Sequence, residues 1–318
     1  GGVNLCRGGP PGAGKSMRAR RLPAIVRERT GRESLEATGI DSVLGLTSSE
    51  HPRLGRRRFR SRHHTVSARG RAGGGSSPRP GEISLAHNGV LFRDGLPVCA
   101  KEALETLRQP LEDGRVQSSR VSGTAVFPAR CMLVCAMNPC KCGWYGYSDR
   151  CRCSPQAVEK YLSRLSGPLL DRIDLFVEVP PLDFDALSRR TPAEPSAAIK
   201  ARVDGARAVQ AARFGPGGPA CNDQMGPAEL SRFCALDDAC RAVMKGAFDR
   251  MGLTARSYDR IRRVARTIAA LDGAGAVAVE PLAAAHPYRP PAHPPRSRPT
   301  PGPPQAHPPA QHNTRVTY

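Results

Sequence analysis

The chain of 318 residues has no run of about 18 apolar residues, the length that a membrane-spanning helix requires. Its first residues lead directly into a glycine-rich segment and do not have the pattern of a signal peptide. Eleven cysteines in such a chain favour reduced thiols or a metal site over a disulfide framework. We therefore expect a cytoplasmic protein that does not enter a membrane.

Lysine and large apolar residues are scarce. Six of the 48 basic residues are lysine, and the net charge is +20. Such a charge favours nucleic-acid binding, but GC-rich codons also produce a chain rich in arginine, alanine, glycine and proline. The hydrophobic content is 39%, and 31 prolines with 32 glycines indicate a non-globular part. We place that part at residues 287–318, where the composition predicts disorder.

The segment GPPGAGKS matches the phosphate-loop pattern G-x-x-x-x-G-K-[S/T]. Glycines let backbone N–H groups turn toward phosphates, the lysine reaches the β and γ oxygens, and the serine binds Mg²⁺. The alternative is a plain glycine–proline turn, which a strand before the loop and a helix after it disfavour. The predicted nucleotide-binding residues are Gly9, Pro10, Pro11, Gly12, Ala13, Gly14, Lys15 and Ser16.

Strands and helices alternate in the first 182 residues, which predicts an α/β domain with a parallel sheet covered on both faces. The predicted strands are residues 3–7, 90–92, 131–137 and 175–179, with a hairpin at 115–127. The predicted helices are 15–22, 31–44, 101–109 and 156–165; Thr30 and Glu33 have capping-box spacing for the second. Arg7 and Arg93 interrupt apolar strands, where an unpaired buried arginine would be costly.

Residues 193–286 have a purely helical pattern, which predicts a small all-α lid domain after a linker. Its predicted helices are residues 197–214, 227–234, 237–251 and 254–271.

Four cysteines form the pattern C-x-C-x₈-C-x-C directly after residue 138. Four thiolates so close together can hold a tetrahedral Zn²⁺, although the usual spacing is C-x-x-C and a C-x-C pair strains chelation of one ion. Free thiols are the alternative. The candidate ligands are Cys140, Cys142, Cys151 and Cys153.

Residues 51–81 contain nine arginines and no acidic residue, and their composition predicts a loop or hairpin. Such a segment can follow the phosphate backbone of DNA, or it can be a solvated loop. The arginines are Arg53, Arg56, Arg57, Arg58, Arg60, Arg62, Arg69, Arg71 and Arg79.

These motifs together resemble the YifB/ComM family, the magnesium-chelatase-subunit-like AAA+ ATPases. The similarity covers about residues 1–286 and includes GGVNLCRGGPPGAGKS, RFRSRHHTVS, LRQPLEDGRV, FPARCMLVCAMNPCKCG, RLSGPLLDRIDLFVEVP and LTARSYDRIRRVARTIAALDG. The resemblance implies ATP and Mg²⁺ as cofactors, a homo-hexamer, and DNA branch migration; chelatase relatives act on a protein partner instead. It also implies that an N-terminal Lon-protease-like domain is missing here.

The resemblance also implies roles for single residues. Asp94 matches the Mg²⁺-binding Walker B aspartate, and Asn138 matches the sensor that positions water at the γ-phosphate. Arg172 matches the arginine finger offered to a neighbouring subunit, and Arg256 matches the second sensor arginine of the helical lid. Phosphoryl transfer requires such cations around the β and γ oxygens.

One position departs from the family pattern. The family follows the Walker B aspartate with a glutamate that polarises the attacking water, and this chain has Gly95 there. We therefore expect nucleotide binding with impaired hydrolysis; an inactive nucleotide-binding fragment is a further alternative.

Overall fold

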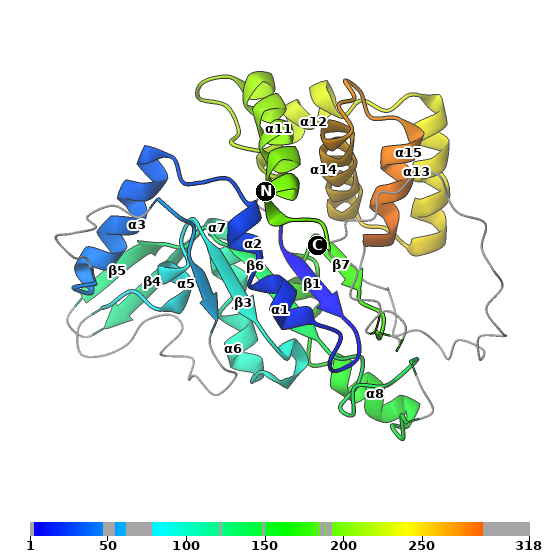
Figure 1. The fold of residues 1–318 in the computed structure, drawn as a ribbon, viewed down its shortest axis with the longest axis horizontal. Helices are drawn as coiled ribbons and strands as arrows, with labels where there is room; N and C mark the ends of the chain where they lie inside the picture. The colour runs from blue at the N-terminus through cyan, green and yellow to red at the C-terminus, as the bar shows by residue number, and fades with distance from the viewer. Residues whose placement is uncertain are drawn as a thin grey trace.

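The computed structural model describes residues 3–46, 55–61, 78–120, 123–147, 150–182, 184, 188 and 193–288. A five-stranded parallel sheet lies at its centre, with the strand order β2-β3-β6-β1-β7 (Figure 1). Its strands are β1 (Leu5–Gly8), β2 (Phe59–Ser61), β3 (Val90–Arg93), β6 (Met132–Met137) and β7 (Leu175–Glu178). The parallel sheet predicted from the alternating pattern is therefore confirmed.

The two faces of the sheet bury alternate residues of each strand, which explains the continuous apolar runs. One face packs on α1 (Lys15–Ala19) and α2 (Leu22–Ile25), through Leu5, Val134 and neighbouring apolar side chains. The other face, which includes Cys6 and Leu133, packs on a set of short helices. These are α5 (Glu82–Leu85), α6 (Lys101–Glu105), α7 (Arg108–Asp113) and α9 (Gly167–Leu170).

The strand order determines which loops meet. All five strands are parallel, so their carboxyl ends lie at one edge of the sheet. Strand β6 lies between β1 and β3, and the loops that follow these three strands are therefore neighbours. The phosphate loop, Asp94 and Asn138 follow β1, β3 and β6, respectively.

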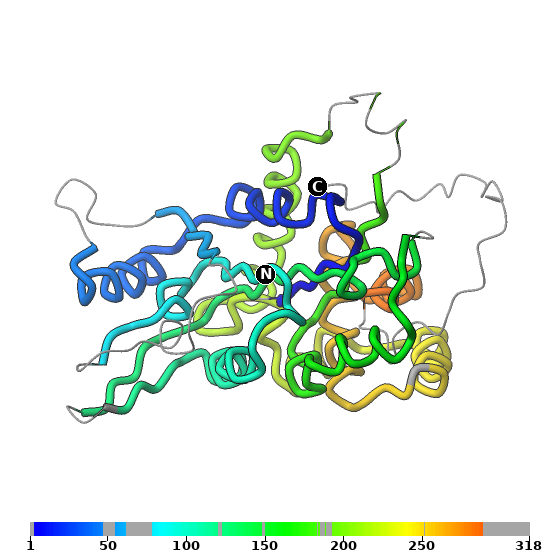
Figure 2. Tube along the Cα trace, turned by 90° about the horizontal axis from the view of Figure 1, so that it is seen from below, coloured from blue at the N-terminus to red at the C-terminus, as the bar shows by residue number. Residues whose placement is uncertain are grey.

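The predicted hairpin is confirmed. Strands β4 (Arg115–Arg120) and β5 (Gly123–Pro128) pair antiparallel, with Arg115 opposite Pro128. In Figures 1 and 2 the hairpin lies at the same end of the molecule as α3 (Gly31–Val43). The capping box predicted for α3 is present, since Thr30 and Glu33 each accept from the other's backbone N–H.

The helical part follows the sheet. It contains α11 (Ser196–Phe214), η2 (Asn222–Gln224), α12 (Pro227–Phe233), α13 (Asp238–Met251), α14 (Ala255–Leu271), α15 (Val279–Ala285) and η3 (His286–Tyr288). The amphipathic helix α14 contacts α11, α12 and α15, and its Ile261 is buried. The ion pair between Arg260 Nε and Asp174 Oδ1, at 2.7 Å, attaches α14 to the amino edge of the sheet.

Several sequence predictions about local structure were wrong. The helix predicted for 15–22 ends at Ala19, and Pro23 lies in the first turn of the separate helix α2. Residues 59–61 form the edge strand β2, parallel to β3, instead of the predicted loop or hairpin; Phe59 stacks on Phe92 of β3 with ring centroids 5.6 Å apart. The helix predicted for 101–109 is divided into α6 and α7, and Pro110 lies in the first turn of α7, where no intrahelical N–H bond is lost. Helix α15 was missed; it forms because Leu282 and Ala285 enter the helical core.

The remaining elements are η1 (Leu96–Val98) and α8 (Pro155–Leu162). No helix in the described ranges is long and apolar enough to cross a membrane. Most of the arginine-rich segment lies outside the described residues. So does the tail predicted at residues 287–318, except residues 287 and 288, which belong to η3 and are ordered in a 3₁₀ turn.

Candidate functional site

The phosphate loop turns sharply between β1 and α1. Gly12 and Gly14 have φ angles of 80° and 75°, in the left-handed region that glycine adopts readily. Gly9 is required for a different reason, since a Cβ there would lie 2.3 Å from the backbone oxygen of Val179. Glycine is therefore required at the two positions that the motif specifies, Gly9 and Gly14, and also at Gly12 between them.

Lys15 is enclosed by this loop and is 8% exposed. Its Nζ donates to the backbone oxygens of Gly9 and Pro10, at 2.8 and 2.7 Å, and to Oδ1 of Asn138 at 2.9 Å. Burial lowers the pKa of Lys15 below its ordinary value, and the Asp94 carboxylate opposes this shift. The ammonium thus lies where the phosphate loop and the end of β6 meet.

Ser16 and Asp94 meet at the same edge of the sheet. The Ser16 hydroxyl donates to Oδ2 of Asp94 at 2.8 Å, although 78 positions separate the two residues. A hydroxyl and a carboxylate are oxygen ligands of the kind that Mg²⁺ binds, and both side chains fit that role. The structure therefore brings together Lys15 and Ser16, which the phosphate-loop motif indicates, and Asp94 and Asn138, which the family resemblance indicates.

Asp94 lies between a buried arginine and a glycine with left-handed backbone angles. Gly95 has φ 64° and ψ 47°, in the left-handed region, and a Cβ there would lie 2.9 Å from Cγ2 of Val98. Arg93 is 3% exposed, and its Nη2 donates to Sγ of Cys99 at 3.6 Å. Strands β1 and β3 both form although Arg7 and Arg93 are buried in them, so the two arginines do not disrupt the sheet.

Arg172 and Arg256 lie together at a different place. Both approach the carboxylate of Glu112, Arg172 through a direct ion pair and Arg256 at 3.7 Å. The hydrogen bond from Arg172 holds the pKa of Glu112 below its ordinary value. All three residues line a cavity of about 970 Å³ together with Asn4 and Gly89, which precede β1 and β3. This cavity is at the amino edge of the sheet, opposite the phosphate loop.

Sequence reasoning assigned no role to Glu112. The motif LRQPLEDGRV contains it, but nothing in the motif shows that its partner lies 60 positions further along the chain. Only the packing of α7 beside the segment after α9 brings the carboxylate to Arg172.

Three arginines of the basic segment form ion pairs within the chain. Arg57 Nη2 lies 2.8 Å from Glu33 Oε2, and Arg60 Nη2 lies 2.8 Å from Glu82 Oε1. Arg58 pairs with Asp41, which is 1% exposed. The segment has no acidic residue of its own, but neighbouring elements provide the partners. The prediction that the arginines of this segment have no acidic partners is therefore wrong for these three residues.

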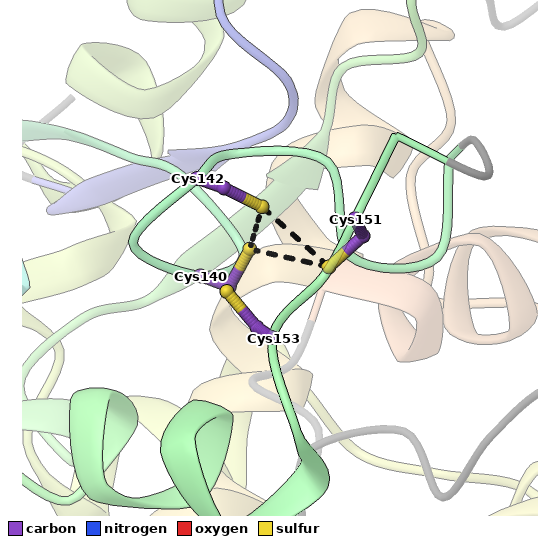
Figure 3. Close-up of side chains that lie close together, drawn as sticks. All are labelled: Cys140, Cys142, Cys151 and Cys153. Carbon is purple, nitrogen blue, oxygen red and sulfur yellow. Dashed lines mark hydrogen bonds between the residues drawn. The ribbon is translucent and has the colours of Figure 1, made fainter.

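The four cysteines of the C-x-C-x₈-C-x-C pattern also meet (Figure 3). Their sulfur atoms all lie within 4.8 Å of one another. Sγ of Cys140 is 3.2 Å from that of Cys142 and 3.8 Å from that of Cys151, and the latter two are 3.5 Å apart. The arrangement matches a four-ligand metal site in composition and in compactness.

The fold and the phosphate-loop site define a P-loop α/β protein of the AAA+ type. The chain belongs to the magnesium chelatase subunit ChlI family: the model of magnesium chelatase, subunit ChlI, matches residues 1–187, and the model of the C-terminal part of that subunit matches residues 193–289.

The chain is similar to several curated bacterial proteins. It is 40% identical to the uncharacterised protein YifB of Escherichia coli K12 over 290 residues, 91% of this chain and 56% of that protein. It is 42% identical to competence protein ComM of Haemophilus influenzae over 287 residues, 90% of this chain and 55% of that protein. An uncharacterised protein of Mycobacterium tuberculosis H37Rv is 41% identical over 290 residues, 91% of this chain and 57% of that protein. The predicted YifB/ComM resemblance is confirmed, and the chain spans about half the length of these relatives.

Proposed function

We propose that the chain binds ATP with Mg²⁺ at the carboxyl edge of the sheet. The observation that carries the proposal is the convergence of Lys15, Asn138 and the Ser16–Asp94 pair at the end of the phosphate loop. Lys15 neutralises charge on the β and γ phosphates, while Ser16 and Asp94 bind the metal. A bound Mg²⁺ supplies further charge neutralisation on the phosphates.

We propose that this chain hydrolyses ATP only slowly. Asn138 hydrogen-bonds Lys15 at the end of β6, a position from which its amide can orient water at a γ-phosphate. The position after Asp94 has no carboxylate to polarise that water, because Gly95 has no side chain. A missing residue of this kind lowers the rate by about 10²- to 10⁴-fold.

We propose that the active assembly is a homo-hexamer in which Arg172 acts on the nucleotide of a neighbouring copy. Arg172 and Arg256 lie at the amino edge of the sheet, and the phosphate loop lies at the carboxyl edge. An arginine at that edge lies far from its own phosphate loop. The Arg256 side chain is 53% exposed, whereas that of Arg172 is 11% exposed, so in the proposed assembly Arg172 leaves its pair with Glu112 to reach a neighbouring nucleotide. The Glu112 carboxylate holds both arginines at this surface.

We propose DNA as the substrate on which ATP binding acts, in a remodelling or branch-migration role. Two observations support this class of substrate: the similarity to competence protein ComM, and the exposed arginines Arg56, Arg79 and Arg115. A chelatase-like action on a protein partner would show no salt-dependent DNA binding, and an inactive fragment would show neither DNA binding nor turnover.

Titration of a fluorescent ATP analogue in the presence of Mg²⁺ tests the nucleotide site. We expect saturable binding by the unmodified chain and its loss in Lys15→Ala. The control is Lys245→Ala, because Lys245 is an exposed residue of α13. Unchanged affinity in Lys15→Ala would refute the site assignment, and loss of binding in both variants would indicate a general effect on folding.

A further inference from the structure

The loop between β6 and α8 has almost no hydrophobic core of its own. Between Met137 and Pro155, only Cys140 and Gly143 are buried among the described residues. A loop of this length with so little buried apolar surface does not hold one conformation through packing alone. A cross-link within the loop would provide the missing constraint.

The sulfur positions fit a single tetrahedral ion. A Zn–S bond of about 2.3 Å in a tetrahedron places the sulfurs about 3.8 Å apart. The sulfur–sulfur distances among Cys140, Cys142 and Cys151 run from 3.2 to 3.8 Å, and the sulfur of Cys153 lies within 4.8 Å of the other three (Figure 3). An iron–sulfur cluster binds its cysteines through different iron atoms and therefore requires wider spacing than this.

The backbone around the first C-x-C pair supports metal binding. The Gly143 N–H donates to Sγ of Cys140 at 3.3 Å, an interaction that orients the sulfur and stabilises its thiolate. Gly143 has φ 88°, so the chain turns back after Cys142 without strain. The second pair is also anchored, because Ser154 caps α8 directly after Cys153. Both pairs are therefore attached to regular structure.

The charge of the loop is suited to a tetrathiolate centre. Four thiolates with one Zn²⁺ carry a net charge of about −2. Lys141, Arg150 and Arg152 lie in the same loop and are exposed, so they can offset that charge without being buried. Among the described residues of the loop, those that are buried carry no positive charge that would repel a metal ion.

We propose that Cys140, Cys142, Cys151 and Cys153 bind one structural Zn²⁺, which holds this loop against the phosphate loop. Binding replaces thiol protons with four Zn–S bonds and releases those protons to solvent. The loop reaches the nucleotide site through Gly143, where a Cβ would lie 2.6 Å from Cδ of Pro11 and 3.6 Å from Nδ2 of Asn138. A zinc-bound, ordered loop therefore holds Pro11 and Asn138 in position through Gly143.

Metal analysis of the purified 318-residue chain under reducing conditions tests the site. We expect about one zinc per chain and its loss in the double variant Cys142→Ser/Cys153→Ser. The control is Cys131→Ser, because Cys131 is a half-buried thiol outside the cluster. Substitution with Co²⁺ should produce the visible absorption of a tetrahedral thiolate complex in the unmodified chain and in the control alone.

Two results would overturn the zinc site. One is absence of zinc and of the Co²⁺ spectrum in a chain whose eleven cysteines all react with a thiol reagent once the chain is denatured, since several of them are buried in the native protein. The other is alkylation that shows disulfides among the four cysteines after purification in reducing buffer.

The effect on the phosphate loop rests on the proposed nucleotide binding and has its own measurement. We expect the double variant to bind the fluorescent ATP analogue at least several-fold more weakly than the Cys131→Ser control. Equal affinities would refute the effect of zinc binding on the nucleotide site, but would leave the zinc site itself supported by the metal analysis. Absence of nucleotide binding in every variant would instead refute the proposed function.

Discussion

Replacement of Gly95 by glutamate restores the carboxylate that water activation requires, but the backbone at this position opposes it. Gly95 has φ 64°, and a residue with a Cβ in this left-handed region costs about 1–2 kcal/mol. The new Cβ also lies 2.9 Å from Cγ2 of Val98. Val98 is 55% exposed, so its side chain can rotate away or be shortened without a cavity in the core.

The magnitudes follow from this geometry. A loss of 1–2 kcal/mol lowers Tm by about 2–8 °C in a domain of this size. The carboxylate itself raises kcat by about 10²- to 10⁴-fold. We therefore expect Gly95→Glu to increase ATP turnover and decrease stability, and the added change Val98→Ala to recover part of the lost Tm.

Phosphate release at saturating ATP and thermal unfolding measure the two effects. The matched control is Gly95→Ala, which has the same backbone cost and no carboxylate. We expect Gly95→Ala to lose stability without gaining turnover. The reasoning fails if Gly95→Ala leaves Tm unchanged, or if the unmodified chain already hydrolyses ATP as fast as Gly95→Glu.

Three further predictions concern arginines. The double change Arg56→Ala/Arg79→Ala should lower the slope of log Kd against log salt concentration by the amount expected for the loss of about two phosphate contacts. An unchanged slope would show that these exposed residues do not contact DNA. Arg58→Ala should instead lower the free energy of unfolding by about 2–3 kcal/mol, because it leaves the buried Asp41 without this partner. In the Gly95→Glu background, the Lys15→Ala and Arg172→Ala proteins should each be inactive. A mixture of the two should recover ATP turnover, because an Arg172→Ala copy supplies an intact phosphate loop and a neighbouring Lys15→Ala copy supplies an intact Arg172. No recovery in mixed assemblies would contradict the action of Arg172 between subunits.

Local sequence signals were sufficient for several parts of the molecule. The GPPGAGKS segment specified the phosphate loop, because its glycines are required by backbone geometry that no other residue adopts easily. The apolar run at residues 132–137 specified a strand buried on both faces, and Thr30 with Glu33 specified a helix start. Each of these signals depends on interactions between residues close together in the chain.

Family resemblance, rather than residue spacing, assigns roles to Asp94 and Asn138. Their meeting with Lys15 and Ser16 depends on the strand order β3-β6-β1, which spacing along the chain does not reveal. The wrong assignment of residues 59–61 has a related cause. This short segment has weak local preference, and it becomes a strand through pairing with β3.

Sequence alone thus determined the elements whose physical cause is local: the phosphate loop, the buried strand, the hairpin and the four-cysteine pattern. Tertiary structure decided which charges are compensated and which residues act together. Arg57, Arg58 and Arg60 have no acidic neighbour in sequence, yet α3 and α5 bring Glu33, Asp41 and Glu82 to them. Electrostatic interactions depend on distance in space, so the availability of a charge for a partner can be read only from the folded chain.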